Sequence, residues 1–202
     1  MKRLFSLATL ALAGLLGACS ILPKAEPLDV YLLPAQATPS ATRQASVPWS
    51  LRVHKPVSNQ LLDSTRIAVV PDGDRISAYQ GARWNDRAPL LVRDRLIEAF
   101  QHDGQVAAVS SDDSHLHADL ELVTGLRAFQ SEYRNGQPQV HILLDARLVQ
   151  GSTRRILASQ RFDVQQPTTD DSVGAVVRAF GLATDRLGKQ VVSWSLQQAP
   201  RP

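Results

Sequence analysis

The single cysteine of this sequence stands where lipid chemistry is expected. Lys2 and Arg3 precede the apolar run Leu4–Leu15, and Gly17 and Ala18 place small residues directly before Cys19. A basic start, an apolar stretch and a small-residue cleavage site are the parts of a secretory signal. A transmembrane helix needs about 20 apolar residues, and this run is shorter. The pattern predicts a bacterial lipoprotein signal whose lipobox is Leu16, Gly17, Ala18 and Cys19, with cleavage before Cys19.

Cys19 is expected to carry an S-diacylglycerol and an N-acyl group and to become the first residue of the mature chain. Several acyl chains give a stable anchor, since each buried CH₂ contributes about 0.8 kcal/mol. The alternatives are a plain signal peptide with an incidental cysteine, or a buried thiol; no second cysteine exists for a disulfide. Ser20 follows the anchor. In the best-known sorting rule an Asp there retains a lipoprotein in the inner membrane, so by resemblance Ser20 favours the periplasmic face of a Gram-negative outer membrane.

Two groups of polar residues could carry other chemistry. His115, His117, Asp119 and Glu121 would share one face of a strand, which makes a surface zinc site geometrically feasible. The same alternation describes the wet face of a half-buried strand, and we favour that interpretation. His141 and Asp145 could join a serine in a hydrolase triad, but nothing specifies the nucleophile. We therefore expect no catalytic residues, no metal, and no cofactor beyond the lipid on Cys19.

The sequence has no GxSxG, P-loop, GxGxxG, HExxH or CxxC motif, which also favours a protein that is not an enzyme. The three tryptophans, Trp49, Trp84 and Trp194, are candidates for a protein interface, where this residue is enriched. Core packing is their commoner role. The chain has 22 Lys and Arg against 19 Asp and Glu, and the signal removes two positive charges. This near-neutral balance argues against nucleic-acid binding.

The elements that position these residues divide the chain into four parts. Residues 1–18 are the signal, 19–48 a lipidated N-terminus with a Pro- and Ala-rich tether, 49–196 the folded domain, and 197–202 a loose tail. Within the tether, the β-prone run Val30-Tyr31-Leu32-Leu33 could dock as an edge strand that Pro34 stops.

Alternation and turn residues predict the elements of the domain. Strands are expected at 49–53, 66–70, 76–80 and 106–109, and a helix capped by Asn85 or Asp86 is expected to end near Gly104. The alternating runs 116–122, 140–148 and 156–162 form an antiparallel meander, with Asn135-Gly136 as a type I′ turn. A second helix follows the capping residues 170–172 and lies across the meander. The fold class is α+β: a single domain with an antiparallel meander-containing sheet packed against two main helices.

The ordered features resemble the PqiC-like family of ABC-type transport auxiliary lipoproteins. The resemblance rests on the lipobox at Cys19, on the early segment 30–33, and on the strand 51–53 leading through Pro56 and Leu61-Leu62-Asp63 to 67–69. It continues through Ile76-Ser77-Ala78-Tyr79 and Arg83-Trp84 to the helix beginning Pro89-Leu90-Leu91, the meander and the closing helix.

This resemblance implies partners rather than a reaction. Such lipoproteins look like accessory subunits of MCE-type lipid transport, with an MCE-domain protein and inner-membrane ABC transporter subunits as partners and a ring-shaped homo-oligomer as one form. The chain would sit under the outer membrane at the far end of the MCE tunnel. Two other hypotheses stay open: a lipoprotein that acts as an assembly factor or activator of a cell-wall enzyme, and a periplasmic enzyme that uses the His and acidic face.

Overall fold

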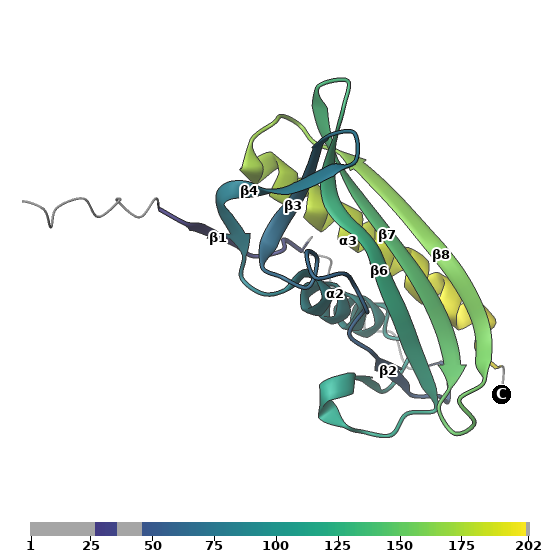
Figure 1. The fold of residues 1–202 in the computed structure, drawn as a ribbon. Helices are drawn as coiled ribbons and strands as arrows, with labels where there is room; N and C mark the ends of the chain where they lie inside the picture. Colours follow the sequence, from purple (N-terminus) through teal and green to yellow (C-terminus); the bar gives the residue numbers. More distant parts are fainter. Residues whose placement is uncertain (1–26, 36–45, 201–202) are drawn as a thin grey trace, which may run out of the picture.

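The computed structural model describes residues 27–35 and 46–200 of the chain. This part contains two α-helices, α2 (Ala88–Asp103) and α3 (Val173–Gln198), a 3₁₀ turn η2 (Asp112–Ser114), and one eight-stranded sheet (Figure 1). The strands are β1 (Asp29–Tyr31), β2 (Leu51–Val53), β3 (Arg66–Asp72), β4 (Arg75–Trp84), β5 (Val109–Ser111), β6 (Leu120–Arg134), β7 (Gln137–Gln150) and β8 (Ile156–Pro167). The α+β class, the two helices and the single domain are confirmed.

The predicted meander forms the larger half of the sheet. β6, β7 and β8 pair antiparallel, with Leu120 opposite Gln150 at one end and Arg134 opposite Gln137 at the other. Asn135 and Gly136 both have positive φ, 52° and 76°, as the two central residues of a type I′ turn require. The alternating apolar side chains of β7 are buried because they face the helices.

The sheet as a whole is mixed, which corrects the expectation of a purely antiparallel arrangement. β2 and β3 both pair parallel with β6, β2 at Leu120–Leu122 and β3 at Gln130–Glu132. β5 is parallel to β2, β4 is antiparallel to β3, and the edge strand β1 is parallel to β4. β3 and β4 form a hairpin with a short turn at Gly73, whereas the parallel pairs join strands from distant parts of the chain, so longer connections set their direction.

Both helices cover one face of the sheet (Figure 1). α3 begins at the cap Ser172, whose hydroxyl accepts from the Ala175 N–H, and its buried stripe packs on β7 and β8. It runs to Gln198, two residues beyond the predicted domain end, and Ala199 is buried. α2 begins after Arg87 without a side-chain cap, so the predicted capping by Asn85 or Asp86 is wrong. Pro89, in its first turn, and Gly104, in the left-handed region at its end, stand as predicted.

The core lies between the helices and the sheet and is centred on three aromatic rings. Trp84 of β4 meets Phe180 of α3 edge to face at 5.2 Å, and Phe129 of β6 lies 4.6 Å from Phe180 between centroids. All three side chains are fully buried. No helix in the described part of the chain is long and apolar enough to span a bilayer.

Candidate functional site

Cys19 and the lipobox Leu16, Gly17, Ala18 and Cys19 lie outside the described residues, as does tether segment 36–45. The described parts of the predicted tether contact the domain. β1 pairs with β4, as expected for a docked edge strand, and Val47 bridges to Val106 after α2. Both ends of segment 36–45 are therefore fixed on the folded domain.

The predicted histidine and acidic strand face does not form. The strand begins at Leu120, and His115 follows η2 with a φ of 57°, in the left-handed region. Asp119 instead accepts hydrogen bonds at one carboxylate oxygen from the Ser50 N–H, at 2.8 Å, and the Ser50 hydroxyl, at 2.7 Å. The Ser50 N–H, followed by its hydroxyl, lowers the pKa of Asp119. This carboxylate fixes β2 to the start of β6.

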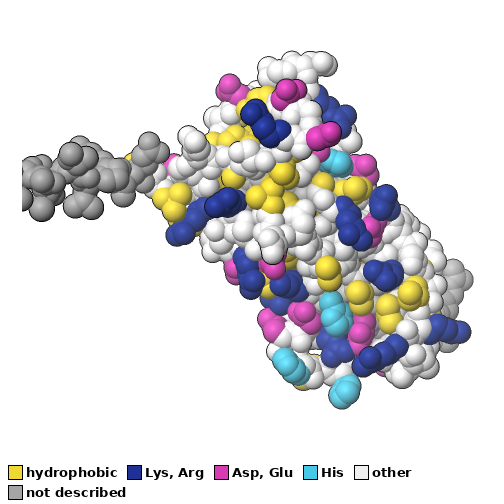
Figure 2. Space-filling view, viewed as in Figure 1, with side chains coloured by type: hydrophobic (Ala, Val, Ile, Leu, Met, Phe, Trp, Pro, Cys, Tyr) yellow, Lys and Arg dark blue, Asp and Glu magenta, His cyan; other side chains and the backbone are white. Residues whose placement is uncertain are grey.

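Glu121 forms ion pairs with two residues of the β2 segment. It contacts Arg52 and lies 3.1 Å from Nε2 of His54. Burial alone would raise the pKa of Glu121, but the hydrogen bond and charge of Arg52, together with His54, outweigh it and lower the pKa. Figure 2 shows histidine side chains mainly at the lower end of the visible face. Within residues 27–35 and 46–200, no three His, Cys, Asp or Glu side chains are grouped to hold a metal ion.

His141 and Asp145 have separate partners on the outer face of the sheet. His141 Nδ1 lies 2.7 Å from Glu132 and Nε2 lies 3.1 Å from Asp163. Asp145 accepts from Nε of Arg161 at 2.7 Å and Nε of Arg127 at 2.9 Å. The two residues thus belong to different ion-pair groups rather than to one triad.

The structure places all three tryptophans in the core. Trp84 is fully buried, and Trp49 and Trp194 are 8% and 6% exposed. Trp194 packs edge to face on Phe162 at 5.7 Å. Their burial within the chain agrees with core packing, the alternative to an interface that the sequence left open.

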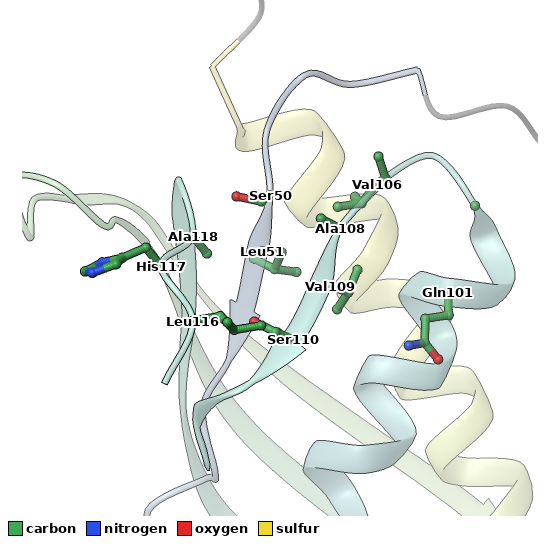
Figure 3. Close-up of a pocket in the computed structure, with 12 residues that line it drawn as sticks. Ser50, Leu51, Gln101, Val106, Ala108, Val109, Ser110, Leu116, His117 and Ala118 are labelled. Carbon is green, nitrogen blue, oxygen red and sulfur yellow. The ribbon is translucent and has the colours of Figure 1, made fainter. Parts of the chain in front are cut away.

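A surface groove that the sequence did not reveal lies where β2, β5 and the end of α2 meet (Figure 3). Its volume is about 570 Å³, within the range of about 300 to 1,000 Å³ that is usual for ligand sites. The lining is mostly small and aliphatic: Leu51, Val106, Ala107, Ala108, Val109, Leu116 and Ala118, with Ser50, Ser110, Gln101, Gly104 and His117 at its polar parts. Leu116 points towards Ser110, whereas the His117 ring points away (Figure 3).

Hydrogen bonds hold the walls of this groove in place. The Arg52 guanidinium donates to the Leu116 carbonyl at 3.0 Å, which fixes the loop before β6. Arg93 of α2, 8% exposed, donates to Asp112 at 3.0 Å and Asp113 at 2.9 Å in η2, which precedes Leu116 in the same connection. Because these are charge-assisted bonds, they are stronger than neutral ones. The wall that carries Leu116 is therefore hydrogen-bonded to both β2 and α2.

The lining of the groove can contact part of a bound molecule. Its apolar lining suits an aliphatic side chain or an acyl chain, and the Ser110 hydroxyl can hydrogen-bond a polar group, whereas the Ser50 hydroxyl is already bonded to Asp119. Leu116 is 59% exposed on one wall, an apolar side chain that a bound partner would cover. The sequence signal was weak: a run of small apolar residues, 106–109, which predicts only a strand.

Comparison with known proteins places the chain in a family. Residues 31–192 match the family described as ABC-type transport auxiliary lipoprotein component. The chain belongs to this family. The match runs from the last residue of β1 through most of α3, so it includes the groove, and it confirms the resemblance found in the sequence.

Two crystal structures are similar to this chain. A crystal structure from Xanthomonas campestris, of the family named DUF330, is 31% identical and covers 84% of this chain and 95% of that one, with a TM-score of 0.77. The crystal structure of a second protein, described as uncharacterized, shares the fold at 13% identity. The match covers 84% of this chain and 99% of that one, with a TM-score of 0.65. An uncharacterized protein of Bradyrhizobium diazoefficiens is 27% identical over 73% of this chain, which spans 39% of that curated relative.

Proposed function

We propose that the chain is a non-enzymatic accessory lipoprotein of an MCE/ABC-type lipid transport system. Lipids on Cys19 hold it at the periplasmic face of the outer membrane, and its folded domain binds the periplasmic MCE component. The family match over residues 31–192 is the observation that supports this proposal most directly. The role in ABC-type transport comes from the family; the MCE partner, the outer membrane and a ring of copies are the parts that we add.

The groove is the surface that we assign to this partner. Arg52 and Arg93 hold the wall that carries Leu116, so binding requires little ordering of this wall. Covering Leu116 and the small apolar lining removes apolar surface from water, which contributes about 25 cal/mol for each Å² buried. The Ser110 hydroxyl offers a hydrogen bond beside this apolar surface, which favours one orientation of the partner. This combination of a rigid apolar centre and a polar border is typical of protein-binding sites.

Site-specific photo-crosslinking in living cells tests the assignment. A photoreactive phenylalanine replaces Leu116 on the groove wall in one strain and Ile156 at the start of β8 in the other. The two side chains are matched in exposure, 59% and 52%, and the second lies outside the groove. We expect an MCE-domain protein to be captured from position 116 and not from position 156, and native mass spectrometry of the purified lipoprotein gives the number of copies.

The other outcomes separate the alternatives. A cell-wall synthase or an assembly machine captured from position 116 would replace the transport proposal with the second hypothesis, an assembly factor or activator. Cys19→Ala tests the anchor independently: we expect the variant to leave the membrane fraction for the periplasm and to weaken the membrane barrier. If Cys19→Ala stays in the membrane fraction, the lipid anchor is wrong.

A further inference from the structure

Three aliphatic side chains are exposed at alternate positions in and beside the edge strand β1. Leu28, Val30 and Leu32 are 49%, 51% and 70% exposed. Val30 lies in β1, and Leu28 and Leu32 flank it two residues away on either side. Tyr31 and Leu33 pack against the core, so the three exposed side chains share the opposite, outer face. A lone exposed aliphatic residue is ordinary, but three on one face form an apolar stripe that calls for a partner.

Two arginines extend this stripe across the neighbouring strands. Val30 lies opposite Arg83 of β4, and Arg83 lies opposite Arg66 of β3, so the three side chains project from the same face of the sheet. Both arginines are exposed, and neither forms an ion pair with any residue in the described part of the chain. Figure 2 shows yellow and dark blue side chains side by side in this part of the surface. We call Leu28, Val30, Leu32, Arg66 and Arg83 the β1 patch.

The covalent chain places this patch close to the lipid anchor. Only eight residues, 20–27, separate Cys19 from Leu28. Even fully extended, the nine steps from Cys19 to Leu28 reach about 30 Å. The strand β1, which begins directly after Leu28, is fixed to the domain by its pairing with β4. The β1 patch therefore cannot move further from the membrane than this tether allows. This step rests on the anchor of the proposed function.

We propose that the β1 patch lies on the anionic phospholipid surface of the membrane that holds the anchor. The aliphatic side chains enter the boundary between headgroups and acyl chains, and the two guanidinium groups meet lipid phosphates. Apolar side chains flanked by unpaired basic ones are what peripheral proteins use at this boundary. Each arginine near an anionic surface contributes about 1 kcal/mol, so the pair strengthens the contact about 30-fold. The anchor supplies attachment, and the patch fixes the orientation of the domain.

A single fluorescent label tests this contact. Because Cys19 is the only cysteine and acylation consumes its thiol, Val30→Cys in the full lipidated protein gives one reactive site. Ile156→Cys is the matched control, since the two native side chains are 51% and 52% exposed. Each variant carries a polarity-sensitive dye and is reconstituted into vesicles of phosphatidylethanolamine and phosphatidylglycerol, with brominated lipid as a quencher. Vesicles of phosphatidylcholine provide the neutral surface.

We expect the dye at position 30, and not at 156, to shift to the blue and to lose emission to brominated lipid in the anionic vesicles. Arg66→Gln with Arg83→Gln should abolish most of the difference between anionic and neutral vesicles. If protein that floats with the vesicles gives the same spectra at both positions, the membrane contact is wrong although the anchor stands. If position 30 responds only when the crosslinked partner protein is added, the patch is a protein interface. Protein that does not float shows instead that the anchor has failed.

Discussion

Gly181 of α3 is where the segment carrying β1 rests on the domain. A Cβ atom at Gly181 would lie 2.7 Å from the Pro34 carbonyl oxygen and 3.0 Å from the Pro34 Cβ. Both atoms are backbone or ring atoms that cannot swing aside. Gly181→Ala should therefore push residues 27–35 away from the helix while leaving the meander intact.

The size of the effect follows from two opposed contributions. Alanine is favoured over glycine inside a helix by about 1 kcal/mol. Forcing an extra methyl group into a packed contact costs about 1 to 3 kcal/mol. The net loss is then about 0 to 2 kcal/mol, and it falls on the docking of segment 27–35, since this segment can yield without opening the core. Gly174→Ala in the same helix is the control, because its new Cβ would meet only the flexible Arg178 guanidinium at 3.5 Å.

Hydrogen–deuterium exchange read by mass spectrometry distinguishes the two variants. We expect faster exchange over residues 27–35 in Gly181→Ala, with little change in β7, and urea unfolding close to that of the natural chain. Gly174→Ala should keep its protection and match or exceed the natural stability. The reasoning is refuted if Gly181→Ala protects segment 27–35 as well as the natural chain and gains stability as the control does.

Two further predictions concern the core and the outer face. Trp84→Ala, which empties a fully buried site against Phe180, should cost about 3 to 5 kcal/mol in urea unfolding; a loss below about 1 kcal/mol would contradict the central role of this ring. Hydrogen bonds from Arg161 and then Arg127 lower the pKa of Asp145 from 3.8 to about 2. A depressed folded pKa contributes stability above pH 3.8 that is lost as the pH falls towards 2. Asp145→Asn should make the melting temperature less dependent on pH over that window. The free energy involved is under about 1 kcal/mol because the ion pairs are exposed. The same fall of the melting temperature with pH in the variant as in the natural chain would contradict this prediction.

The parts of the fold that the sequence predicted are those with local causes. Alternation along β7, the Asn135-Gly136 turn and the Ser172 cap each act within a few residues, so each leaves a pattern that can be found without knowing the rest of the chain. The edge strand at β1 was also within reach, because Pro34 marks its end and its neighbours are β-prone.

The mixed sheet and the groove could not be found this way. The parallel pairing of Ala68 with Gln130 joins residues far apart in the sequence, and no local pattern encodes it. The expected strand from Leu116 fails because Arg93 binds the two aspartates of η2 and Arg52 holds the Leu116 carbonyl. Hydrogen bonds from distant elements thus overrule a local alternation. The groove is built from three such segments, so it exists only in the folded chain.

The two surfaces that we assign to partners share one structural support. β2 and β3 occupy the same edge of β6, at Leu120–Leu122 and at Gln130–Glu132. Between them, the Val57 N–H donates to the Thr124 carbonyl, and the Val57 carbonyl accepts from the Leu126 N–H, which closes the edge. Two groups of strands therefore extend from this edge of β6. β2 and β5 border the groove, and β3, β4 and the β1 segment carry the β1 patch. Because both groups of strands are hydrogen-bonded to β6, contact of the β1 patch with a membrane would fix the direction in which the groove faces its partner.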